Sequence, residues 1–432
     1  MSSDCASTRQ SSVEAEADGP STQQENQLVS TPSADTQEGD NDHVEPARKE
    51  EDEDGETNDQ DDDEEEEEED ADSIFLKRLR ALVQGFYARG DFESVVGIMQ
   101  QVFRFYATRK YITPDIDLQH WAKTFVDSDS PIAYCWSLDF DVAFFARLCY
   151  EGFLSISSYP EKIVMVLMPW IDPQRAVMEF GSMRVSKSLT KRARGYHMTV
   201  NADFEGVVRG CVAQHGEGWL WPRMQQLLRD CFCAPEDLHQ QIQHARGGGD
   251  TQQWKARLQA CGFRVATFEL WDSSTGDLVA ADLGYVVGAC YVSMSGFRKP
   301  NTKSCGTVQL TATYALLKRC GFAFWDLGMV MEYKTGLGAR VVPRREFIDM
   351  FHLVRDRRCN LCIPSGAPGV NVSSAGTAAS TASGSVPADV LVKEARAMRT
   401  RASVQKKQNA TPEQDRPDPA SSGKGKDASD VS

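Results

Sequence analysis

The sequence predicts an α+β fold between two disordered tails, and three observations support this prediction. Residues 1–72 carry 28 acidic and 3 basic residues, and such a like-charged, weakly apolar segment does not bury enough surface to fold. Residues 364–432 are rich in Ser, Ala, Gly, Thr and Pro, which is typical of a second disordered segment. The segment between them carries alternating helical and strand-like apolar patterns.

Charge is distributed unevenly along the chain. The formal net charge is −16, yet residues 73–363 hold 35 basic against 28 acidic residues. This central part is therefore about +7, which suits a polyanion partner such as RNA because phosphate neutralisation supplies most non-specific affinity. A solvated basic surface without a partner is the alternative.

The first part of the central segment is predicted to be mainly helical. Apolar residues recur at helical spacing over residues 74–87 and 95–106, with Gly90 ending the first helix and Asp91 capping the second. Residues 73–130 are thus assigned to a helical extension.

Residues 131–260 are predicted to form the first part of the core. The pattern gives a helix over 141–150, strands over 153–156, 162–168, 176–180 and 197–200, and helices over 204–214 and 221–231. Residues 239–253 contain three consecutive glycines and are predicted to be an inserted loop.

Residues 261–363 are predicted to form a second, strand-rich part. Strands are expected over 264–270, 278–287 and 289–294, then a helix over 308–320, a strand over 322–327 and a closing helix over 347–354. This β-β-β-α-β order is an α+β arrangement.

Twelve scattered cysteines are typical of reduced thiols in the cytosol. Only two pairs of cysteines cluster, Cys231 with Cys233 and Cys359 with Cys362. The first spacing is poor for zinc and the second pair lies at the domain end, so we expect no metal and no cofactor.

No apolar run approaches the roughly 20 residues of a membrane helix, and the first residues do not resemble a signal peptide. We therefore expect a cytoplasmic protein without a membrane partner.

Four blocks of sequence carry the functional signal. They are WIDPQRAV from Trp170, VSKSLTK from Val185, DFEGVVRGC from Asp203 with GWLWPRM from Gly218, and WDLGMVMEYKTGLGARVVPRREF from Trp325. In this order and at these intervals they resemble the leucyl/phenylalanyl-tRNA–protein transferases, over about half of the chain. The resemblance implies a GNAT-type acyltransferase-like domain over residues 261–363 and a smaller α/β domain before it. It also implies an aminoacyl-tRNA and a protein N-terminus as partners, and no DNA.

The resemblance assigns residues to the donor side. Stacking on an aromatic ring is worth about 1–3 kcal/mol per unpaired base, and Trp219 matches the family tryptophan associated with the 3′ adenosine, with Trp170 at another. Tyr291, Met294 and Phe297 are expected to line an apolar aminoacyl pocket. Core packing is the alternative for all five aromatic and apolar residues.

A basic segment follows the second block. It places Lys187, Lys191, Arg192 and Arg194 within two helical turns, so we expect these side chains to contact tRNA phosphates. A solvated charged face is the alternative. For Arg344 and Arg345, ion pairing within the fold is as good an interpretation as RNA contact.

Asp326 is the predicted catalytic residue. It ends an apolar strand, where burial would raise its pKa towards a useful range for a base or proton relay. The alternative is a carboxylate that accepts backbone donors at a strand end.

Two departures from the family affect the acceptor side. The family has a glutamine two residues after the aspartate, where this chain has Gly328, and the family's strand glutamate corresponds to Val292 or Ser293. We therefore assign Ser293 and Gly328 to the acceptor side and leave the identity of the acceptor residue open.

The sequence thus predicts an aminoacyltransferase that moves Leu or Phe, with Met as a further donor, from tRNA to a protein N-terminal amine in N-degron turnover. One alternative is a catalytically weak module that binds tRNA or a protein N-terminus on the same scaffold. Another is an acyltransferase that uses acetyl-coenzyme A, which is disfavoured because residues 303–307 offer a single glycine for a pyrophosphate loop.

Overall fold

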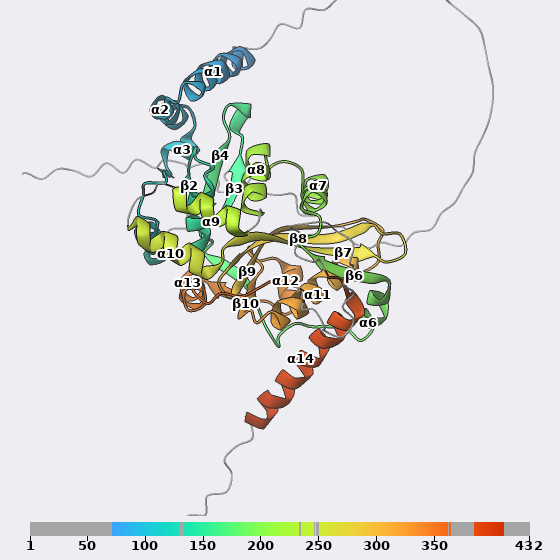
Figure 1. Cartoon of the computed structure of the whole chain (residues 1–432). Helices are drawn as coiled ribbons and strands as arrows, with labels where there is room; N and C mark the ends of the chain where they lie inside the picture. The colour runs from blue at the N-terminus through green and yellow to red at the C-terminus, as the bar shows by residue number, and fades with distance from the viewer. Residues whose placement is uncertain are drawn as a thin grey trace, which may run out of the picture. The chain divides into compact units, whose positions relative to one another are not determined.

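Figure 1 shows the computed structural model of the chain, which describes residues 71–128, 134–232, 235–245, 247, 250–361, 363 and 384–409. All of these residues belong to one compact unit. The acidic residues 1–70 and much of the segment 364–432 lie outside the described residues, as do Cys233 and Cys362 of the two cysteine clusters.

An eight-stranded mixed sheet forms the centre of the described structure, in the order β11-β5-β10-β9-β8-β7-β6-β12. In chain order the strands are β5 Gln174–Glu179, β6 Tyr196–Val200, β7 Arg264–Asp272, β8 Leu278–Val287, β9 Cys290–Arg298, β10 Phe324–Asp326, β11 Arg340–Pro343 and β12 Val386–Pro387. The β9–β10 pair is parallel and the other neighbouring pairs are antiparallel. The predicted mixture of helices with a sheet is confirmed, while the division at residue 260 stays a prediction.

Two short sheets lie outside the large one. The first pairs β1 Lys110–Tyr111 with β2 Cys135–Trp136, and the second pairs β3 Leu154–Ser158 with β4 Val166–Trp170. The expected strand over 162–168 is thus shifted, because Pro160–Lys162 forms a 3-10 turn first.

The helices follow the predicted pattern over most of the described chain. They are α1 Ala71–Ala88, α2 Phe92–Val102, α3 Arg104–Ala107, α4 Leu118–Asp127, α5 Val142–Tyr150, α6 Leu189–Arg192, α7 Phe204–His215, α8 Pro222–Phe232, α9 Pro235–His244, α10 Thr251–Cys261, α11 Cys305–Arg319, α12 Glu332–Gly336, α13 Arg344–His352 and α14 Ala388–Asn409. The predicted cap is confirmed at α2, where the Asp91 carboxylate accepts the backbone N–H of Ser94 at 3.1 Å. None of these helices is both long and apolar enough to cross a bilayer.

Helices cover both faces of the sheet. On one face α7 and α8 pack against β7, β8 and β9, with Leu283 and Tyr285 of β8 in the shared core. On the other face α11 packs against the same strands, with Ala280 and Val286 of β8 in a second core. Successive strand residues point to opposite faces, and both faces of β8 are covered by helices. This strand is therefore apolar along most of its length.

Two predictions of irregular structure are wrong over part of their range. Most of the expected loop over 239–253 is helical, because α9 continues to His244 and α10 begins at Thr251. Asp250 caps α10 by accepting the backbone N–H of Gln253 at 3.0 Å. The loop prediction considered the glycines and not this cap.

The second correction concerns the C-terminal tail. Within the segment predicted to be disordered, β12 joins the sheet edge beside β6, and α14 packs on α11. Leu391, Val392 and Ala395 of α14 are each 0% exposed. A polar, alanine-rich helix of this kind is stabilised mainly by tertiary packing, which sequence composition does not reveal.

We expect Leu391→Ala to lower the free energy of unfolding by about 2–5 kcal/mol, because it removes a buried side chain and leaves a cavity. Thr400, an exposed residue on the same helix, is the matched control, and Thr400→Ala should change stability by no more than about 0.5 kcal/mol. Urea denaturation measures both values. Equal, small effects would show that α14 does not dock on the sheet in solution.

Candidate active site

The predicted site residues of β9 and β10 lie at the centre of the sheet, where these two strands pair in parallel. Trp325 is aligned with Tyr291, and Asp326 with Val292. As neighbours on one strand, Trp325 and Asp326 point to opposite faces. Polar groups therefore gather on both sides of the same strand end.

On one face, Asp326 forms a buried ion pair with Arg175 of β5. The guanidinium Nη1 lies 2.6 Å from the carboxylate, and the two side chains are 1% and 0% exposed. The other carboxylate oxygen accepts the backbone N–H of Gly328 at 2.8 Å. Burial raises the pKa of Asp326, and the charge of Arg175 opposes that shift.

Arg175 also contacts two further segments. Its Nη2 donates to the carbonyl oxygen of Gly152 at 2.9 Å, and its guanidinium lies 4.7 Å from the ring centre of Phe347. Gly152 has φ +91°, and a Cβ there would lie 2.6 Å from Ile348. Glycine is therefore required where the chain presents this carbonyl to Arg175.

On the opposite face, a second buried carboxylate belongs to Asp282 of β8, which is 5% exposed. It accepts hydrogen bonds from the hydroxyls of Tyr291 at 2.6 Å and Ser293 at 2.8 Å. The indole N–H of Trp325 donates to the same Ser293 hydroxyl at 2.9 Å. Asp282, Tyr291, Ser293 and Trp325 thus form one hydrogen-bonded cluster, which we call the Asp282 cluster.

Lys334 fixes the loop that follows β10. Its Nζ donates to the carbonyl oxygens of Leu327 at 2.7 Å and Met329 at 2.9 Å, on either side of Gly328. Gly328 has φ +74°, and a Cβ there would lie 3.4 Å from the carbonyl oxygen of Ser293. The structure therefore places the two predicted acceptor-side residues next to each other, and a longer side chain at 328 would be strained.

Two groups of this region titrate near neutral pH. Burial raises the pKa of Asp282 to about 7, although its hydrogen bonds to Tyr291 and Ser293 oppose the shift. Burial lowers the pKa of Lys334 to about 8. Groups with such pKa values can exchange protons at physiological pH, which is the requirement for a general base or acid.

The three predicted pocket residues lie on β9 but differ in their surroundings. Tyr291 is 0% exposed and packs against Phe268, with ring centres 4.9 Å apart. Phe297 lies against α7, where a Cβ at Gly210 would be 2.3 Å from its ring. Met294 is partly buried against the first core. Their role in binding an aminoacyl side chain stays a prediction.

Exposed apolar side chains surround the loop after β10. Met329, Val330 and Tyr333 are 43%, 38% and 52% exposed. Large apolar residues that are exposed together often mark a binding surface. This surface adjoins Gly328 and Lys334 in the chain.

Both predicted tryptophans are largely buried, each with 7% exposure. Trp170 stacks on Tyr134 with ring centres 5.5 Å apart, and its indole N–H donates to Asp172 at 2.8 Å. The backbone carbonyl of Trp219 accepts a hydrogen bond from the Ser157 hydroxyl at 2.8 Å. Their stacking role stays a prediction.

The predicted phosphate contacts, Lys187, Lys191, Arg192 and Arg194, are all exposed on and around α6. The turn of the fourth block holds this segment in place, since the backbone N–H of Arg184 donates to the carbonyl oxygen of Leu337 at 2.7 Å.

The arginines of the PRREF block have partners within the fold. Arg344 donates to the carbonyl oxygen of Phe125 at 2.9 Å, and Arg345 pairs with Asp127 at 2.6 Å.

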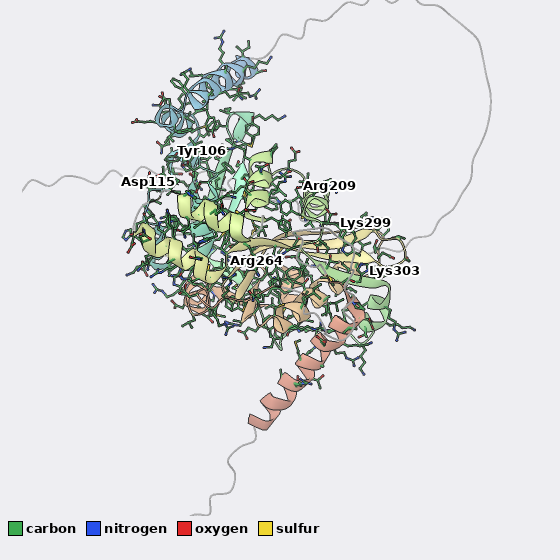
Figure 2. All side chains as sticks on the ribbon, in the orientation of Figure 1. Tyr106, Asp115, Arg209, Arg264, Lys299 and Lys303 are labelled. Carbon is green, nitrogen blue, oxygen red and sulfur yellow. The ribbon has the colours of Figure 1, made fainter. Side chains whose placement is uncertain are left out.

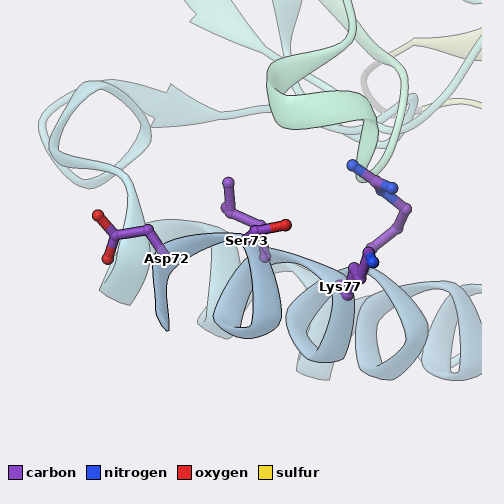
Figure 3. Close-up of a pocket in the computed structure, with 5 residues that line it drawn as sticks. Asp72, Ser73 and Lys77 are labelled. Atoms are coloured by element: carbon purple, nitrogen blue, oxygen red, sulfur yellow. The ribbon is translucent and has the colours of Figure 1, made fainter. Parts of the chain in front are cut away.

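A hollow of about 320 Å³ lies along α1 and is lined by Asp72, Ser73, Leu76, Lys77 and Arg80 (Figure 3). All five residues come from one helix, and none belongs to the four blocks. Cys231 and Cys359 are buried thiols, and no group of three possible metal ligands occurs among the described residues.

The comparisons with known proteins agree with this arrangement. A family model described as leucyl/phenylalanyl-tRNA protein transferase matches residues 250–352. The leucyl/phenylalanyl-tRNA–protein transferase of Ruegeria pomeroyi is 28% identical over 181 residues, which are 41% of this chain and 70% of the relative. That of Shewanella piezotolerans is 26% identical over 196 residues, 44% of this chain and 70% of the relative.

The matched residues 250–352 contain the parallel β9–β10 pair, the Asp282 cluster and Asp326. Fold and site together define a mixed α/β protein with buried polar groups, Asp326 and the Asp282 cluster, around the end of β10. In these residues the chain is similar to the leucyl/phenylalanyl-tRNA–protein transferases.

Sequence reasoning missed two residues of this region as functional candidates. Asp282 interrupts an otherwise apolar strand, LVAADLGYVV, and an acid in such a strand is a usable signal because an isolated buried charge is costly. Lys334 lies within the fourth block, but its position beside Leu327 and Met329 depends on the folded loop.

We expect Asp326→Asn to lower the free energy of unfolding by about 3–5 kcal/mol, because it leaves the buried Arg175 charge uncompensated. The exposed pair Arg345–Asp127 provides the control, and Asp127→Asn should cost no more than about 1 kcal/mol. Urea unfolding at constant pH compares the two. A loss for Asp326→Asn as small as that of the control would contradict a structural role of the pair.

We expect Asp282 to make stability fall with rising pH. Its pKa is about 7 in the folded protein against an ordinary value of 3.8, so the folded state binds the proton more tightly than the unfolded chain does. Stability should therefore decline between about pH 4 and about pH 7, by at most about 1.4 kcal/mol per unit. Asp282→Asn should remove this component in unfolding experiments across that range, whereas the exposed Asp277→Asn should keep it.

Proposed function

We propose that this protein is an aminoacyltransferase that moves an apolar aminoacyl group, leucine or phenylalanine and also methionine, from tRNA to a protein N-terminal amine. The observation that carries the proposal is the arrangement around the end of β10, where Asp326 binds the Gly328 amide, Gly328 adjoins Ser293, and Ser293 binds the buried Asp282, in a chain that is similar to this family. These groups suit a reaction that brings an amine to an ester and removes a proton.

The reaction sets a clear chemical requirement. The amine nitrogen attacks the carbonyl carbon of the ester that joins the amino acid to the terminal ribose. A C–N bond forms, the C–O bond to the ribose breaks, the amine loses a proton and the ribose oxygen gains one. Positioning supplies much of the rate, and a base or relay adds about 10²–10⁴-fold.

We propose that Asp282 receives the proton and that Asp326 acts as a relay or positioning residue. Asp282 has a pKa of about 7, so an appreciable fraction is ionised at neutral pH. Asp326 is 0% exposed and engages both Arg175 and the Gly328 amide. Through these bonds it orients the loop beside Ser293.

The same acid bears on the choice of acceptor. The glutamine and glutamate that the family uses near the acceptor are replaced here by Gly328 and by Val292 or Ser293. Asp282 lies directly behind the Ser293 hydroxyl, at 2.8 Å, and supplies negative charge close to the same place. A cationic N-terminal amine, and acceptors beginning with Arg or Lys, are favoured by this charge.

On the donor side, we assign the aminoacyl side chain to Met294 and Phe297 together with the exposed Met329, Val330 and Tyr333. Tyr291 would act from behind this surface, since it is fully buried. An apolar surface separates close analogues by only about 10–200-fold, which is consistent with several apolar donors.

For the terminal adenosine we retain Trp219 and Trp170, which are each 7% exposed. The exposed cations of α6 would hold the tRNA phosphates. Since aminoacyl-tRNA is consumed where proteins are made, we place the reaction in the cytoplasm, with N-degron turnover of the product as its consequence.

A second candidate function is a binding module that recognises tRNA or a protein N-terminus without efficient transfer. It is favoured by one observation, the positive φ of Gly328 at the position of the family glutamine. The backbone there is built for glycine, so the family's acceptor contact is absent from this chain's local structure.

Transfer of radiolabelled leucine from Leu-tRNA to peptides that differ only in their first residue tests the proposal. We expect transfer by the full chain, with peptides beginning with Arg or Lys as the best acceptors. Asp282→Asn should reduce the transfer rate by about 10²–10⁴-fold while tRNA affinity is unchanged, and Asp277→Asn should behave as the wild type.

The outcomes separate the candidates. Tight binding of Leu-tRNA without transfer to any peptide would support the binding module. If the transfer rate is unchanged in Asp282→Asn but falls strongly in a folded Asp326→Asn variant, Asp326 and not Asp282 is the base.

A further inference from the structure

Three segments that are far apart in the chain are basic and contain no acidic residue. They are residues 181–200 with Arg184, Lys187, Lys191, Arg192 and Arg194, residues 295–305 with Arg298, Lys299 and Lys303, and residues 395–409 with Arg396, Arg399, Arg401, Lys406 and Lys407. The last segment belongs to α14, which lies beyond residue 352, where the family match ends.

The fold brings these segments together. The side chain of Arg192, on α6, donates to the Ser304 hydroxyl at 2.8 Å and so joins the first segment to the loop before α11. Lys299 and Lys303, labelled in Figure 2, lie on this loop. α14 packs against α6 and the 3-10 turn Ala193–Gly195 that follows it, and a Cβ at Gly181 would lie 3.1 Å from the Cβ of Ala402.

The orientation of α14 determines which of its cations lie away from α11. Glu394 pairs with Arg319 of α11 at 2.5 Å, which fixes the side of α14 that faces α11. At about 100° per residue, Arg396 and Arg399 lie about 160° and 140° around the helix from Glu394. They therefore lie on the flank of α14 away from Arg319, where both are exposed, and α14 also packs against α6.

The cations on this surface are available to a partner. We define the three-segment basic surface as Lys187, Lys191, Arg192, Arg194, Arg298, Lys303, Arg396 and Arg399, all of which are exposed. Among the residues that the structure describes, none of them forms an ion pair. By contrast, Lys299 pairs with Asp277 and Lys393 with Asp389.

We propose that α14 is a second RNA-binding element, which extends the contacts of α6 along the phosphate backbone of the tRNA body, away from the aminoacylated end. The proposal rests on the proposed function, since it takes aminoacyl-tRNA as the partner. A helix of 22 residues is about 33 Å long, so α14 extends the track well beyond the single turn of α6.

The chemistry of the surface favours RNA over an anionic membrane. Amphipathic helices that bind membranes present an exposed apolar face for insertion, whereas the apolar residues Leu391, Val392 and Ala395 are already buried against the sheet and α11. A track of unpaired cations without intervening acids is the form expected for phosphate contacts that do not read sequence.

The double variant Arg396→Ala, Arg399→Ala in the full chain tests this proposal. We expect its affinity for Leu-tRNA to fall roughly tenfold at physiological salt, and the slope of log affinity against log salt to fall by about 2, one for each lost phosphate contact. Transfer from a short aminoacylated 3′ fragment should be unchanged, because the fragment does not reach α14.

The matched control removes the same charge elsewhere. Arg78 of α1 and Arg104 of α3 are exposed, and the double variant Arg78→Ala, Arg104→Ala should keep the wild-type affinity and salt slope. Thermal melting verifies that both double variants remain folded.

Two results would overturn the proposal. One is an Arg396→Ala, Arg399→Ala variant with wild-type affinity and salt slope for tRNA. The other is equal weakening in both double variants, which would show that only total charge matters. The wild type could also bind phosphatidylserine vesicles while the Arg396→Ala, Arg399→Ala variant does not. If that variant keeps its tRNA affinity, this result would assign the surface to a membrane instead.

The result also separates this proposal from the proposed function. If the wild type binds tRNA through α14 but transfers no amino acid, the RNA surface stands and the transferase reaction fails. If the wild type transfers leucine and the α14 variant binds tRNA normally, the transferase reaction stands and the RNA surface fails.

Discussion

The buried ion pair between Arg175 and Asp326 is the interaction on which the centre of this structure depends. Arg175 contacts the carbonyl of Gly152, the carboxylate of Asp326 and the ring of Phe347, so one side chain connects four segments that are distant in sequence. Both charges are removed from water, so each stabilises the fold only while the other is present. This arrangement fixes where β10 ends and therefore where the loop with Gly328 begins.

The residues of the family signature are used largely as structural contacts. In the glycine-rich turn, Gly338 has φ +111° and approaches the carbonyl of Ser182 so closely that a Cβ would lie at 2.4 Å. Arg344 and Arg345 bind a backbone carbonyl and Asp127. The signature therefore reflects how the segments around β5, β10 and α13 are held together.

The electrostatics of the site differ from what its apolar strands suggest. Asp282 lies in a strand that is buried along most of its length, and its carboxylate accepts hydrogen bonds from the hydroxyls of Tyr291 and Ser293. Burial makes this group titrate near pH 7, and Lys334 titrates nearby at about 8. The chain lacks the family's acceptor-side glutamine, yet it holds an acid behind Ser293 that comes from a different strand.

The sequence by itself determined the local features of this protein: the amphipathic helices, the cap at Asp91, the strands from β7 to β10 and the family signature around Asp326. These follow from apolar periodicity and from motifs of neighbouring residues. Only the tertiary structure decided that Asp282 is hydrogen-bonded to Ser293 and that Arg175 pairs with Asp326. It also decided that α14, within a segment predicted to be disordered, packs against α6. The physical reason is that each of these depends on contacts between distant segments, whose burial and charge pairing appear only once the sheet is assembled.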